Sequence, residues 1–421
     1  MAEEDHGVTR SLEELRQTFK SGRTRSIDWR KQQLRAILRL LHENEDVLFQ
    51  SLESELGKHP VESYRDEIGV VKKSVDHALS CIDQWMSPKK GRLPLLFFPA
   101  SGKVLPEPLG LVLIIGSWNF PITLTLDPLI GAISAGNTVV LKPSELAPKC
   151  ASFLANKLPV YLDPKAIKVI EGGREVANQL LEYKWDKIFF TGSTKVGKIV
   201  MSAAAKHLTP VTLELGGKCP AILDSLPNSD MKIEQLKKTI KFFYGDDVTN
   251  LKNLAKIVNK THFDRLRNLL EDPAVANCIV YGGSFDDTNL IIEPTILLDP
   301  PLDAEIMNEE IFGPLLPIIT LENIEESIEF INSKPKPLAL YAFTKNESFK
   351  KRILAETSSG SYSFDTFSHE KAVLERSFYF ELEPRHPPWN NFKLDFLRLA
   401  YNFNYVGLVL HLLGLKRSSN A

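Results

Sequence analysis

The sequence has little cysteine, no excess of basic residues and no apolar run at its amino terminus, and each absence excludes a class of protein. Its 421 residues include four cysteines, which are too few and too widely spaced for a disulfide framework or a CxxC metal site. Lys and Arg number 51 against 53 Asp and Glu, a net charge of −2, which argues against binding to nucleic-acid phosphates. We therefore expect a protein of a reducing compartment, with no structural metal and no nucleic-acid partner. The cysteines are Cys81, Cys150, Cys219 and Cys278.

The two ends of the chain carry no clear targeting segment. The amino terminus is acidic and has neither the apolar stretch of a secretory signal nor the arginines of a transit peptide. Residues 396–415 are mostly apolar and end before Lys416 and Arg417, but Arg398 and several other polar residues interrupt them. This tail predicts an interfacial or packed helix rather than a membrane span. The expected location is the cytoplasm, with contact to an intracellular membrane surface through the tail left open.

The composition predicts a large core, because 43% of the residues are apolar and 25% are charged. At about 150 residues a domain, the length indicates two or three domains. Residues 11–56 show the apolar spacing of two amphipathic helices. From residue 110 to 217, short apolar runs alternate with helical patterns, which is typical of βαβ units and a parallel sheet.

Beyond Pro220 a less regular pattern predicts a second α/β domain. Helical segments are expected at about 231–244, 261–270, 323–332 and 346–357, with a strand near 278–281. The proline-rich stretch 384–388 marks the boundary before the tail.

Three groups of residues follow predicted strands, at the sheet edge where ligands usually bind. Lys142 and Glu145 could hold a ribose, or Ser144 could simply cap a helix. Gly192 and Gly197 begin a helix whose N–H groups could hold a pyrophosphate, although such turns also occur without a ligand. Asn119 could donate a hydrogen bond to an oxyanion, or could form a turn with Pro121.

Two further motifs offer carboxylates. Glu214 closes a strand among apolar neighbours and could act as a general base with a raised pKa, although most glutamates are simply solvated. Glu310 could hold a ribose and Phe312 could flank an aromatic ring, although a Gly-Pro turn explains the same residues.

Taken together and in this order, the motifs WNFP, KPSE, FFTGSTKVG, LELGGK and EEIFGP closely resemble those of the aldehyde dehydrogenase superfamily. The segments ELGGKCP, KPLALYAFT and FSHEKAVLE are similar to the class 3 branch, and within it to plant-like members related to fatty aldehyde dehydrogenases. The resemblance implies an α/β fold with a Rossmann-like NAD(P)-binding domain at 1–224 and a catalytic domain at 225–360. A bridging segment for oligomerisation follows at 361–384, and an apolar tail at 385–421.

The resemblance also assigns roles to residues. It implies Asn119 as the oxyanion donor and Glu214 as the base that activates the deacylating water. Lys142 and Glu145 would contact the adenosine ribose, and Glu310 and Phe312 the nicotinamide end. The loop beside the pyrophosphate would consist of Gly192, Ser193, Thr194, Lys195, Val196 and Gly197.

The sequence departs from the family pattern at the nucleophile. Family members attack the aldehyde with a cysteine thiolate that lies a few dozen residues after ELGGK, whereas here AILDSLPNSD passes directly into MKIEQLKKT. A second join follows Gly360, where the family has a glycine-rich region. None of the four cysteines follows a Gly-Gln pair, and Cys219 reads best as a packed structural thiol. We interpret the joins as omitted segments.

The predicted function is oxidation of aldehydes, medium or long and aliphatic, to carboxylic acids with NAD or NADP. NAD is favoured because Glu145 would repel an adenosine 2′-phosphate. The expected partners are an aldehyde substrate and a second copy in a homodimer. The missing nucleophile predicts weak or no turnover, and the alternative is a non-catalytic dinucleotide-binding protein or dimer partner.

Overall fold

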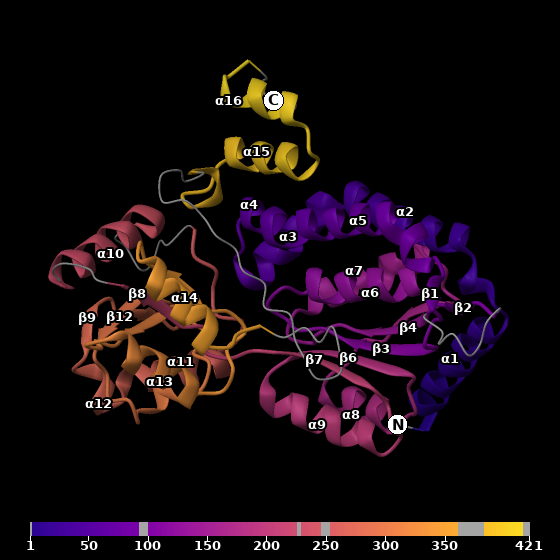
Figure 1. The fold of residues 1–421 in the computed structure, drawn as a ribbon, viewed down its shortest axis with the longest axis horizontal. Coiled ribbons are helices and arrows are strands. Elements are labelled where there is room, and N and C mark those ends of the chain that lie inside the picture. The colour runs from indigo at the N-terminus through magenta and orange to yellow at the C-terminus, as the bar shows by residue number, and fades with distance from the viewer. Residues whose placement is uncertain (1, 92–99, 225–228, 246–252, 361–382, 416–421) are drawn as a thin grey trace. The chain divides into compact units, whose positions relative to one another are not determined.

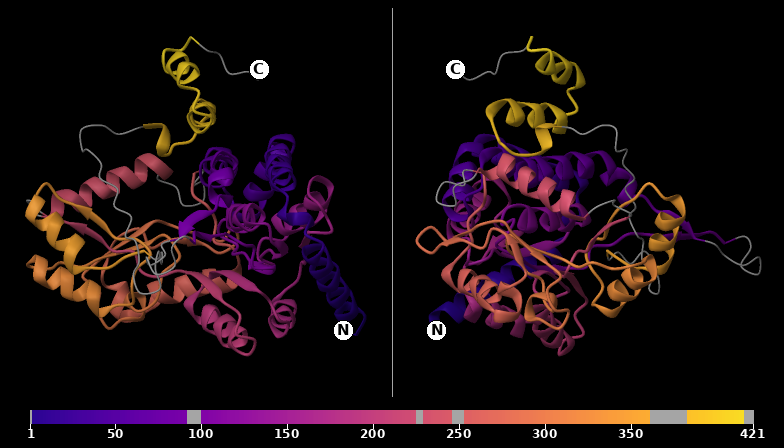
Figure 2. Two further views of the ribbon diagram at one scale, coloured as in Figure 1. Left: turned by 45° about the vertical axis from the view of Figure 1, so that its right-hand side comes forward. Right: turned by 90° about the vertical axis from the view of Figure 1, so that its left-hand side faces the viewer.

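The computed structural model describes residues 2–91, 100–224, 229–245, 253–360 and 383–415, and it forms two compact units. The first unit combines Met1–Glu214 with Asn390–Ala421, and the second is Leu215–Trp389. Figure 1 and Figure 2 show the α/β architecture of each unit.

A five-stranded sheet lies at the centre of the first unit (Figure 1). The strand order is β5-β4-β3-β6-β7. β3 pairs in parallel with both β4 and β6, and β4 pairs in parallel with β5. Every residue of β3 and β4 is buried, as expected for a parallel sheet covered on both faces. The predicted parallel sheet is confirmed. Its strands are β3 (Leu111–Ile115), β4 (Thr138–Lys142), β5 (Ile167–Val169), β6 (Lys187–Gly192) and β7 (Val211–Leu215).

Helices cover both faces of this sheet. α6 (Thr123–Ala135) and α7 (Pro148–Tyr161) lie on one face, and α8 (Arg174–Glu182) and α9 (Thr194–Ala205) lie on the other (Figure 1). A further helical layer packs outside α6 and α7. That layer contains α2 (Ile27–Glu43), α3 (Glu45–Leu56) and α5 (Gly69–Met86), with the short α4 (Pro60–Ser63) and a π-helical turn (Tyr64–Ile68) between α3 and α5. An antiparallel arm of β1 (Lys89–Gly91) and β2 (Gly102–Val104) follows α5.

The amino-terminal region has one helix more than the sequence predicts for residues 11–56. α1 (Ala2–Lys20) precedes α2 and α3. α2 begins where the Ser26 side chain accepts a hydrogen bond from Trp29 N, and α3 ends at Gly57, whose φ of 70° is left-handed. The two predicted helices are therefore present as α2 and α3, and α1 is an additional helix that begins before residue 11.

The second unit is built from smaller sheets. β12 (Thr295–Leu298) pairs in parallel with β13 (Leu315–Ile318) and antiparallel with β9 (Ile279–Tyr281). β8 (Ala221–Leu223) pairs in parallel with β14 (Tyr341–Phe343). A short hairpin joins β10 (Phe285–Asp286) to β11 (Ile291–Ile292). The helices are α10 (Ser229–Tyr244), α11 (Lys260–Glu271), α12 (Pro273–Ala276), α13 (Ile324–Ser333) and α14 (Glu347–Glu356).

The core of the second unit lies around α11 and β12. Phe263, Leu266 and Leu297 are fully buried there, together with Ile306 and Leu315. The helices and the strand that the sequence predicts in this region are present.

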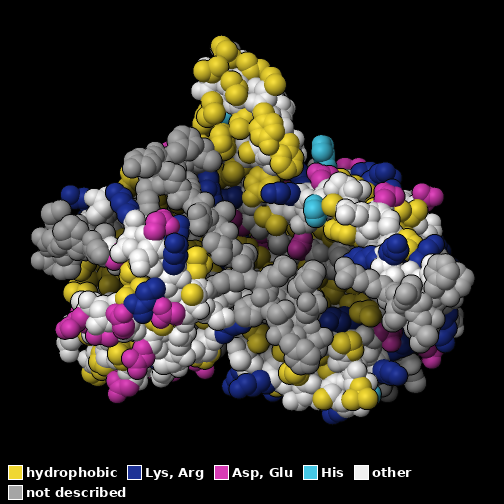
Figure 3. All heavy atoms as spheres, in the orientation of Figure 1, with side chains coloured by type: hydrophobic (Ala, Val, Ile, Leu, Met, Phe, Trp, Pro, Cys, Tyr) yellow, Lys and Arg dark blue, Asp and Glu magenta, His cyan; other side chains and the backbone are white. Residues whose placement is uncertain are grey.

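The apolar tail forms two short helices instead of one. α15 (Asn391–Tyr401) buries Phe396 and Leu397 and contacts α4, α5 and the π-helical turn of the first unit. α16 (Tyr405–Leu412) exposes much of its apolar surface (Figure 3). Within the described part of the chain, we find no helix that is both long and apolar enough to cross a membrane.

The compact units divide the chain at Glu214, upstream of the domain boundary at 224 that the sequence suggests. The difference has a physical reason, because β8 at 221–223 pairs with β14 of the second unit. Most of the expected bridging segment, residues 361–382, lies outside the described residues.

Candidate functional site

The strand order of the five-stranded sheet changes direction at β3. The chain runs outward from β3 through β4 to β5, and then returns to place β6 on the other side of β3. In open α/β sheets, ligands bind outside the carboxyl ends of the strands at such a switch point. The register places Ile115 beside Lys142 on one side and beside Phe190 on the other. The segments that follow β3, β4 and β6 therefore meet at one edge.

The turn after β3 carries Asn119. Its side-chain Oδ1 is buried and has no hydrogen-bond partner in the structure. An asparagine that formed the turn with its own oxygen would have that oxygen bonded. The turn interpretation is therefore wrong for this oxygen, and Asn119 remains a candidate for contact with a ligand.

A buried ion pair supports this turn through a hydrogen bond to the Asn119 backbone. Lys58 Nζ lies 2.7 Å from Glu67 Oε1 and donates a hydrogen bond of 2.7 Å to the Asn119 carbonyl oxygen. Glu67 Oε2 accepts a hydrogen bond of 2.9 Å from Ile122 N, and Lys58 lies over the Phe120 ring. Burial raises the pKa of Glu67. Neither charged residue is predictable as part of the site from the sequence, since nothing in their spacing distinguishes them from surface positions.

The end of β4 places Lys142 and Glu145 together. Lys142 is 3% exposed, and its Nζ lies 2.8 Å from Glu145 Oε2 and 3.1 Å from the Pro143 carbonyl oxygen. The alternative in which Ser144 caps a helix is wrong, because α7 begins only at Pro148 and Ser144 Oγ accepts from Leu146 N within the turn. A cation and a carboxylate thus stand side by side at the sheet edge.

The segment after β6 forms a helix start, as the sequence predicts. Ser193 caps α9 by accepting a hydrogen bond of 3.3 Å from Val196 N. Gly192 packs against the Phe190 ring, which an added Cβ would approach to 2.6 Å. Thr194, Lys195 and Val196 are exposed in the first turn, and Gly197 is buried. Thr191 Oγ1 is a second buried polar atom without a partner.

Glu214 lies near the end of β7. The hydrogen bond from Ile188 N to the Pro210 carbonyl oxygen joins the beginnings of β6 and β7, so the two strands run in the same direction. Glu214 is therefore on the same edge of the sheet as Asn119 and Lys142. Burial raises its pKa, as a general base in an apolar environment requires.

Glu310 and Phe312 belong to the second unit and are not brought to the sheet edge by the fold of the first. The Glu310 carboxylate packs directly on the backbone of Gly216, where an added Cβ would clash with its Oε2. Burial raises the pKa of Glu310, and the Gly217 N–H and the charges of Arg265 and Lys218 oppose that rise. Phe312 is half-exposed with a left-handed φ of 51°.

The cysteines differ in exposure. Cys219 is exposed, with its Sγ 3.7 Å from the Gly217 carbonyl oxygen, so the prediction of a packed thiol is wrong. Cys219 belongs to the segment that links β7 to β8 and is part of no helix or strand. Cys150 is buried at the start of α7, where burial raises its pKa strongly. Such a thiol is a poor nucleophile.

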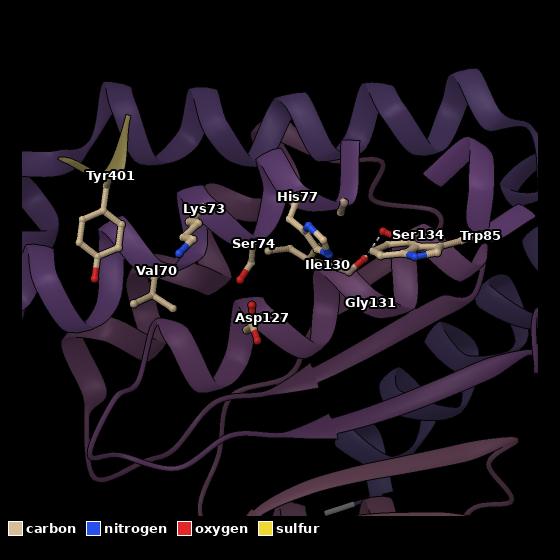
Figure 4. Close-up of a pocket in the computed structure, with 11 residues that line it drawn as sticks. Val70, Lys73, Ser74, His77, Trp85, Asp127, Ile130, Gly131, Ser134 and Tyr401 are labelled. Atoms are coloured by element: carbon tan, nitrogen blue, oxygen red, sulfur yellow. Dashed lines mark hydrogen bonds between the residues drawn. The ribbon is translucent and has the colours of Figure 1, made fainter. Parts of the chain in front are cut away.

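A groove of about 520 Å³ lies between α6 and α5 of the outer helical layer in the first unit (Figure 4). Figure 4 shows His77 and Trp85 on α5, and Asp127 and Ser134 on α6. None of the residues predicted from the motifs lines this groove. Its lining residues are Val70, Lys73, Ser74, His77, Ala78, Trp85, Asp127, Ile130, Gly131, Ser134 and Tyr401.

Comparison with known proteins identifies the family of the chain. The aldehyde dehydrogenase family profile matches residues 2–255 and 228–375. The chain belongs to the aldehyde dehydrogenase family. Aldehyde dehydrogenase family 3 member F1 of Arabidopsis thaliana is 53% identical, and the alignment covers 97% of this chain and 99% of the relative. That alignment runs over 477 positions, more than the 421 residues of the chain.

Two further proteins extend the likeness. Rat aldehyde dehydrogenase family 3 member A2 is 38% identical over 96% of this chain and 97% of its own. The solved structure described as the substrate-bound state of Staphylococcus aureus AldH has a TM-score of 0.80 and 34% identity, and covers 96% of this chain and 99% of that one. The Arabidopsis and rat relatives are family 3 aldehyde dehydrogenases. Membership in the family supports the use of a nicotinamide cofactor and an aldehyde substrate.

Proposed function

We propose that the carboxyl edge of the five-stranded sheet binds NAD and orients an aldehyde for oxidation to a carboxylic acid. The observation that carries the proposal is the gathering of Asn119, Lys142, Glu214 and the 192–197 loop at one edge of the sheet in a member of the aldehyde dehydrogenase family. A switch point of this kind is where a dinucleotide is held in related architectures.

The residues present fit a dinucleotide. Lys142 and Glu145 offer a donor and an acceptor to the two hydroxyl groups of a ribose, and the first turn of α9 offers N–H groups to a pyrophosphate. The unpartnered buried atoms of Asn119 and Thr191 flank the same edge and would gain partners from a polar ligand. Glu145 would repel an adenosine 2′-phosphate, which favours NAD over NADP.

When bound, the nicotinamide would supply a hydride acceptor. The chain's own residues would position the aldehyde: the Asn119 amide would donate a hydrogen bond to the carbonyl oxygen as negative charge develops there. Glu214, whose pKa burial raises, would accept a proton from the attacking water. Glu310 and Phe312 would contact the nicotinamide end.

We further propose that turnover is weak or absent, because the segment with the nucleophilic cysteine is missing. The excess of alignment length over chain length supports omitted segments, and so does the match of the family profile in two pieces that overlap at residues 228–255. The uncovered apolar side chains of β8 and β14 are the surface that a removed neighbour would leave. Sequencing the transcript tests whether the natural protein lacks the nucleophile. Recovery of a cysteine-bearing segment at either join would contradict the proposed loss of turnover.

A non-catalytic role as a dinucleotide-binding protein, or as the partner of a full-length relative in a dimer, is the second candidate. The first unit keeps its strand-end groups, whereas the proposed omissions fall in the second unit. This contrast favours the second candidate. The proposed oxidation and the dinucleotide-binding form of this second candidate both require NADH binding by the first unit, and they differ in turnover. The dimer-partner form does not require NADH binding.

The decisive experiment combines an NADH titration with an assay of NADH production from NAD and decanal. We expect binding without measurable production. Lys142→Met should weaken NADH binding at least about tenfold, the loss of one charge-assisted hydrogen bond of about 1.5 kcal/mol. Lys165→Met, at an exposed position before β5, is the control and should bind as the parent does.

Each alternative outcome has a definite meaning. Production by the purified chain would contradict the predicted inactivity, and single Cys→Ala variants would then locate the nucleophile. No NADH binding by folded protein would reject the dinucleotide site in both candidates.

The tail points to long aliphatic aldehydes presented at a membrane surface. In α16 and the residues around it, Phe403, Tyr405, Val406, Leu413 and Leu415 are each more than half exposed. An apolar helical surface next to Lys416 and Arg417 is typical of interfacial binding to anionic lipids. The protein would then be cytoplasmic and reversibly bound to an intracellular membrane.

Co-sedimentation with phosphatidylserine-containing liposomes tests the tail. Val406→Asp with Val409→Asp should lower the bound fraction several-fold, because charged groups replace apolar ones at the lipid contact. Val160→Asp, an exposed change on α7, is the control and should leave binding intact. Equal sedimentation of all three proteins would argue against the membrane contact.

A further inference from the structure

The groove between α5 and α6 plays no part in the proposed oxidation. Its volume of about 520 Å³ lies within the range of about 300–1,000 Å³ that is typical of small-molecule sites. Figure 4 shows Tyr401 at one end of the groove and Trp85 at the other, with side chains of both helices between them. Ala78 and Ile130 line it and are almost fully buried. The groove therefore has the size and the apolar lining of a ligand site.

The groove is long and narrow. Its lining residues Val70 and Trp85 lie fifteen positions apart on α5, which is about 22 Å at a rise of about 1.5 Å per residue. The volume divided by this length gives a cross-section of about 24 Å². A peptide helix is about 10 Å across with its side chains and would not fit. The shape that the groove can take is a single extended hydrocarbon chain.

Gly131 keeps part of the groove open. It lies inside α6 and lines the groove, and a Cβ added to it would meet no atom within 4 Å. Glycine is unfavourable inside a helix, because it loses more backbone freedom on folding than any other residue. No neighbouring atom requires its small size, so the absence of a side chain here serves the groove rather than the packing of α6.

Two opposite charges face the groove from its two walls. Lys73 on α5 and Asp127 on α6 line it and are exposed. In the part of the chain that the structure describes, neither forms an ion pair or a hydrogen bond, and they do not pair with each other. A ligand with a single charge would be attracted by one of them and repelled by the other. A head group that carries both charges would complement the two walls at once.

The remaining length of the groove is apolar. Ala78 follows Lys73 on α5, and Ile130 follows Asp127 on α6, so the apolar stretch runs from the charges towards Trp85 (Figure 4). The Trp85 side chain is 45% exposed, and its ring meets the edge of the His77 ring at a centroid distance of 5.6 Å. Exposed aromatic surface of this kind gains free energy when it is covered by methylene groups.

We propose that this groove binds a single-chain zwitterionic lipid. The alkyl chain lies along Ala78, Ile130 and Gly131 towards Trp85, while the phosphate of the head group lies at Lys73 and its ammonium group at Asp127. Binding of this ligand requires neither a dinucleotide nor a nucleophilic cysteine, so the inference does not rest on the proposed function. It is also distinct from the membrane contact proposed for α16.

The test is a calorimetric titration of the full chain with dodecylphosphocholine below its critical micelle concentration. Dodecanoate and dodecyltrimethylammonium have the same chain with one charge each, and should bind at least about tenfold more weakly. Octylphosphocholine should also bind at least about tenfold more weakly, because each methylene group lost from an apolar contact lowers the affinity by up to about fourfold. Equal binding of the three twelve-carbon ligands would overturn the proposal.

Charge variants test the assignment of the head group. Asp127→Asn should reverse the order of the two singly charged ligands in favour of dodecanoate, and Lys73→Met should favour dodecyltrimethylammonium. Both positions are exposed, so the fold should tolerate these changes. Lys90→Met, an exposed change on β1, is the control and should keep the parent order. An order of ligands that ignores both groove variants would contradict the assigned contacts.

Variants of Gly131 test the place of the chain. Gly131→Phe fills the open space and should lower the affinity for dodecylphosphocholine at least about tenfold, with the thermal midpoint of the parent. Gly131→Ala adds only the Cβ and is the matched control, which should bind as the parent does. Parent-like affinity in the folded Gly131→Phe variant would overturn the proposal.

A last comparison separates this site from the two proposed above. Val406→Asp with Val409→Asp removes apolar surface from α16 and should leave the titration with dodecylphosphocholine unchanged. Loss of binding in this variant would place the lipid on the tail instead of in the groove. A chain that binds no NADH could still bind the lipid, so failure of the proposed function and failure of this inference are distinguishable.

Discussion

The ion pair of Lys58 and Glu67 is nearly excluded from solvent, with exposed fractions of 5% and 0%. It links the segments around α4 to the turn that carries Asn119, through one hydrogen bond to a carbonyl and another from Ile122 N. A buried pair fixes geometry because each charge is stabilised only in one arrangement. The position of Asn119 therefore depends on Lys58 and Glu67, which lie 61 and 52 positions earlier in the chain.

Removing one member of this pair should destabilise the protein more than removing both. Lys58→Met leaves the Glu67 carboxyl buried without its partner, and should lower the free energy of unfolding by about 3–5 kcal/mol in urea titrations. Lys58→Met with Glu67→Leu should recover part of that loss. Lys31→Met, which removes the exposed pair with Asp83, should cost less than about 1 kcal/mol. Equal losses in the free energy of unfolding for Lys58→Met and Lys31→Met would show that the buried pair contributes no more to stability than the exposed one.

At the scale of elements, α15 is attached to the first unit by charge as well as by apolar contacts. Arg398 pairs with Glu45 of α3, and Lys72 of α5 lies 2.9 Å from the same carboxylate. The Tyr401 hydroxyl donates to the Arg65 carbonyl oxygen at 2.9 Å. Burial works against the Glu45 carboxylate, but the hydrogen bonds and charges of Lys72 and Arg398 outweigh it and lower the pKa of Glu45.

This lowered pKa predicts an acid-sensitive contact. A carboxyl with a lower pKa in the folded state stabilises the fold above its unfolded value near 4.5, and loses that contribution as the pH falls through the folded value. Glu45→Gln should therefore lower the free energy of unfolding by about 1–3 kcal/mol at pH 7, and have little effect near pH 3. Urea titrations at both pH values check this. Glu53→Gln, an exposed change on the same helix, should have no effect at either pH.

Elements were predictable where one local signal decides them. The all-apolar runs of β3 and β4 and the Ser193 cap of α9 give both type and place. The strand-end position of Lys142 followed from the same logic. The break in the tail did not, because Phe403 adopts a left-handed φ of 52° between α15 and α16 that no residue pattern announces. Lys58 and Glu67 were missed for a related reason, since their burial is decided by distant segments.

At the scale of the whole molecule, the two units differ in how well their apolar residues are covered. In the first unit the central strands are fully buried, whereas in the second the short sheet of β8 and β14 leaves Leu223, Tyr341 and Phe343 at least half exposed. Paired strands with exposed apolar side chains are sites of self-association.

The exposed sheet predicts association that a charge would suppress. Phe343→Lys should reduce light scattering at micromolar concentration and leave the thermal midpoint within about 2 °C, because the side chain is already half exposed. Val160→Lys, which replaces an isolated exposed residue on α7, should leave scattering unchanged. Scattering that persists in the Phe343 variant would locate the association elsewhere.

The first unit is closed by residues from both ends of the chain, with the second unit inserted between them. During synthesis on a ribosome, α15 can reach α5 only after all of the second unit has been made. The contacts of Arg398 and Tyr401 thus form last, however early the parallel sheet condenses. A protease cut inside the second unit would leave two fragments that α15 still holds together, so a nicked chain should elute as one species from a sizing column.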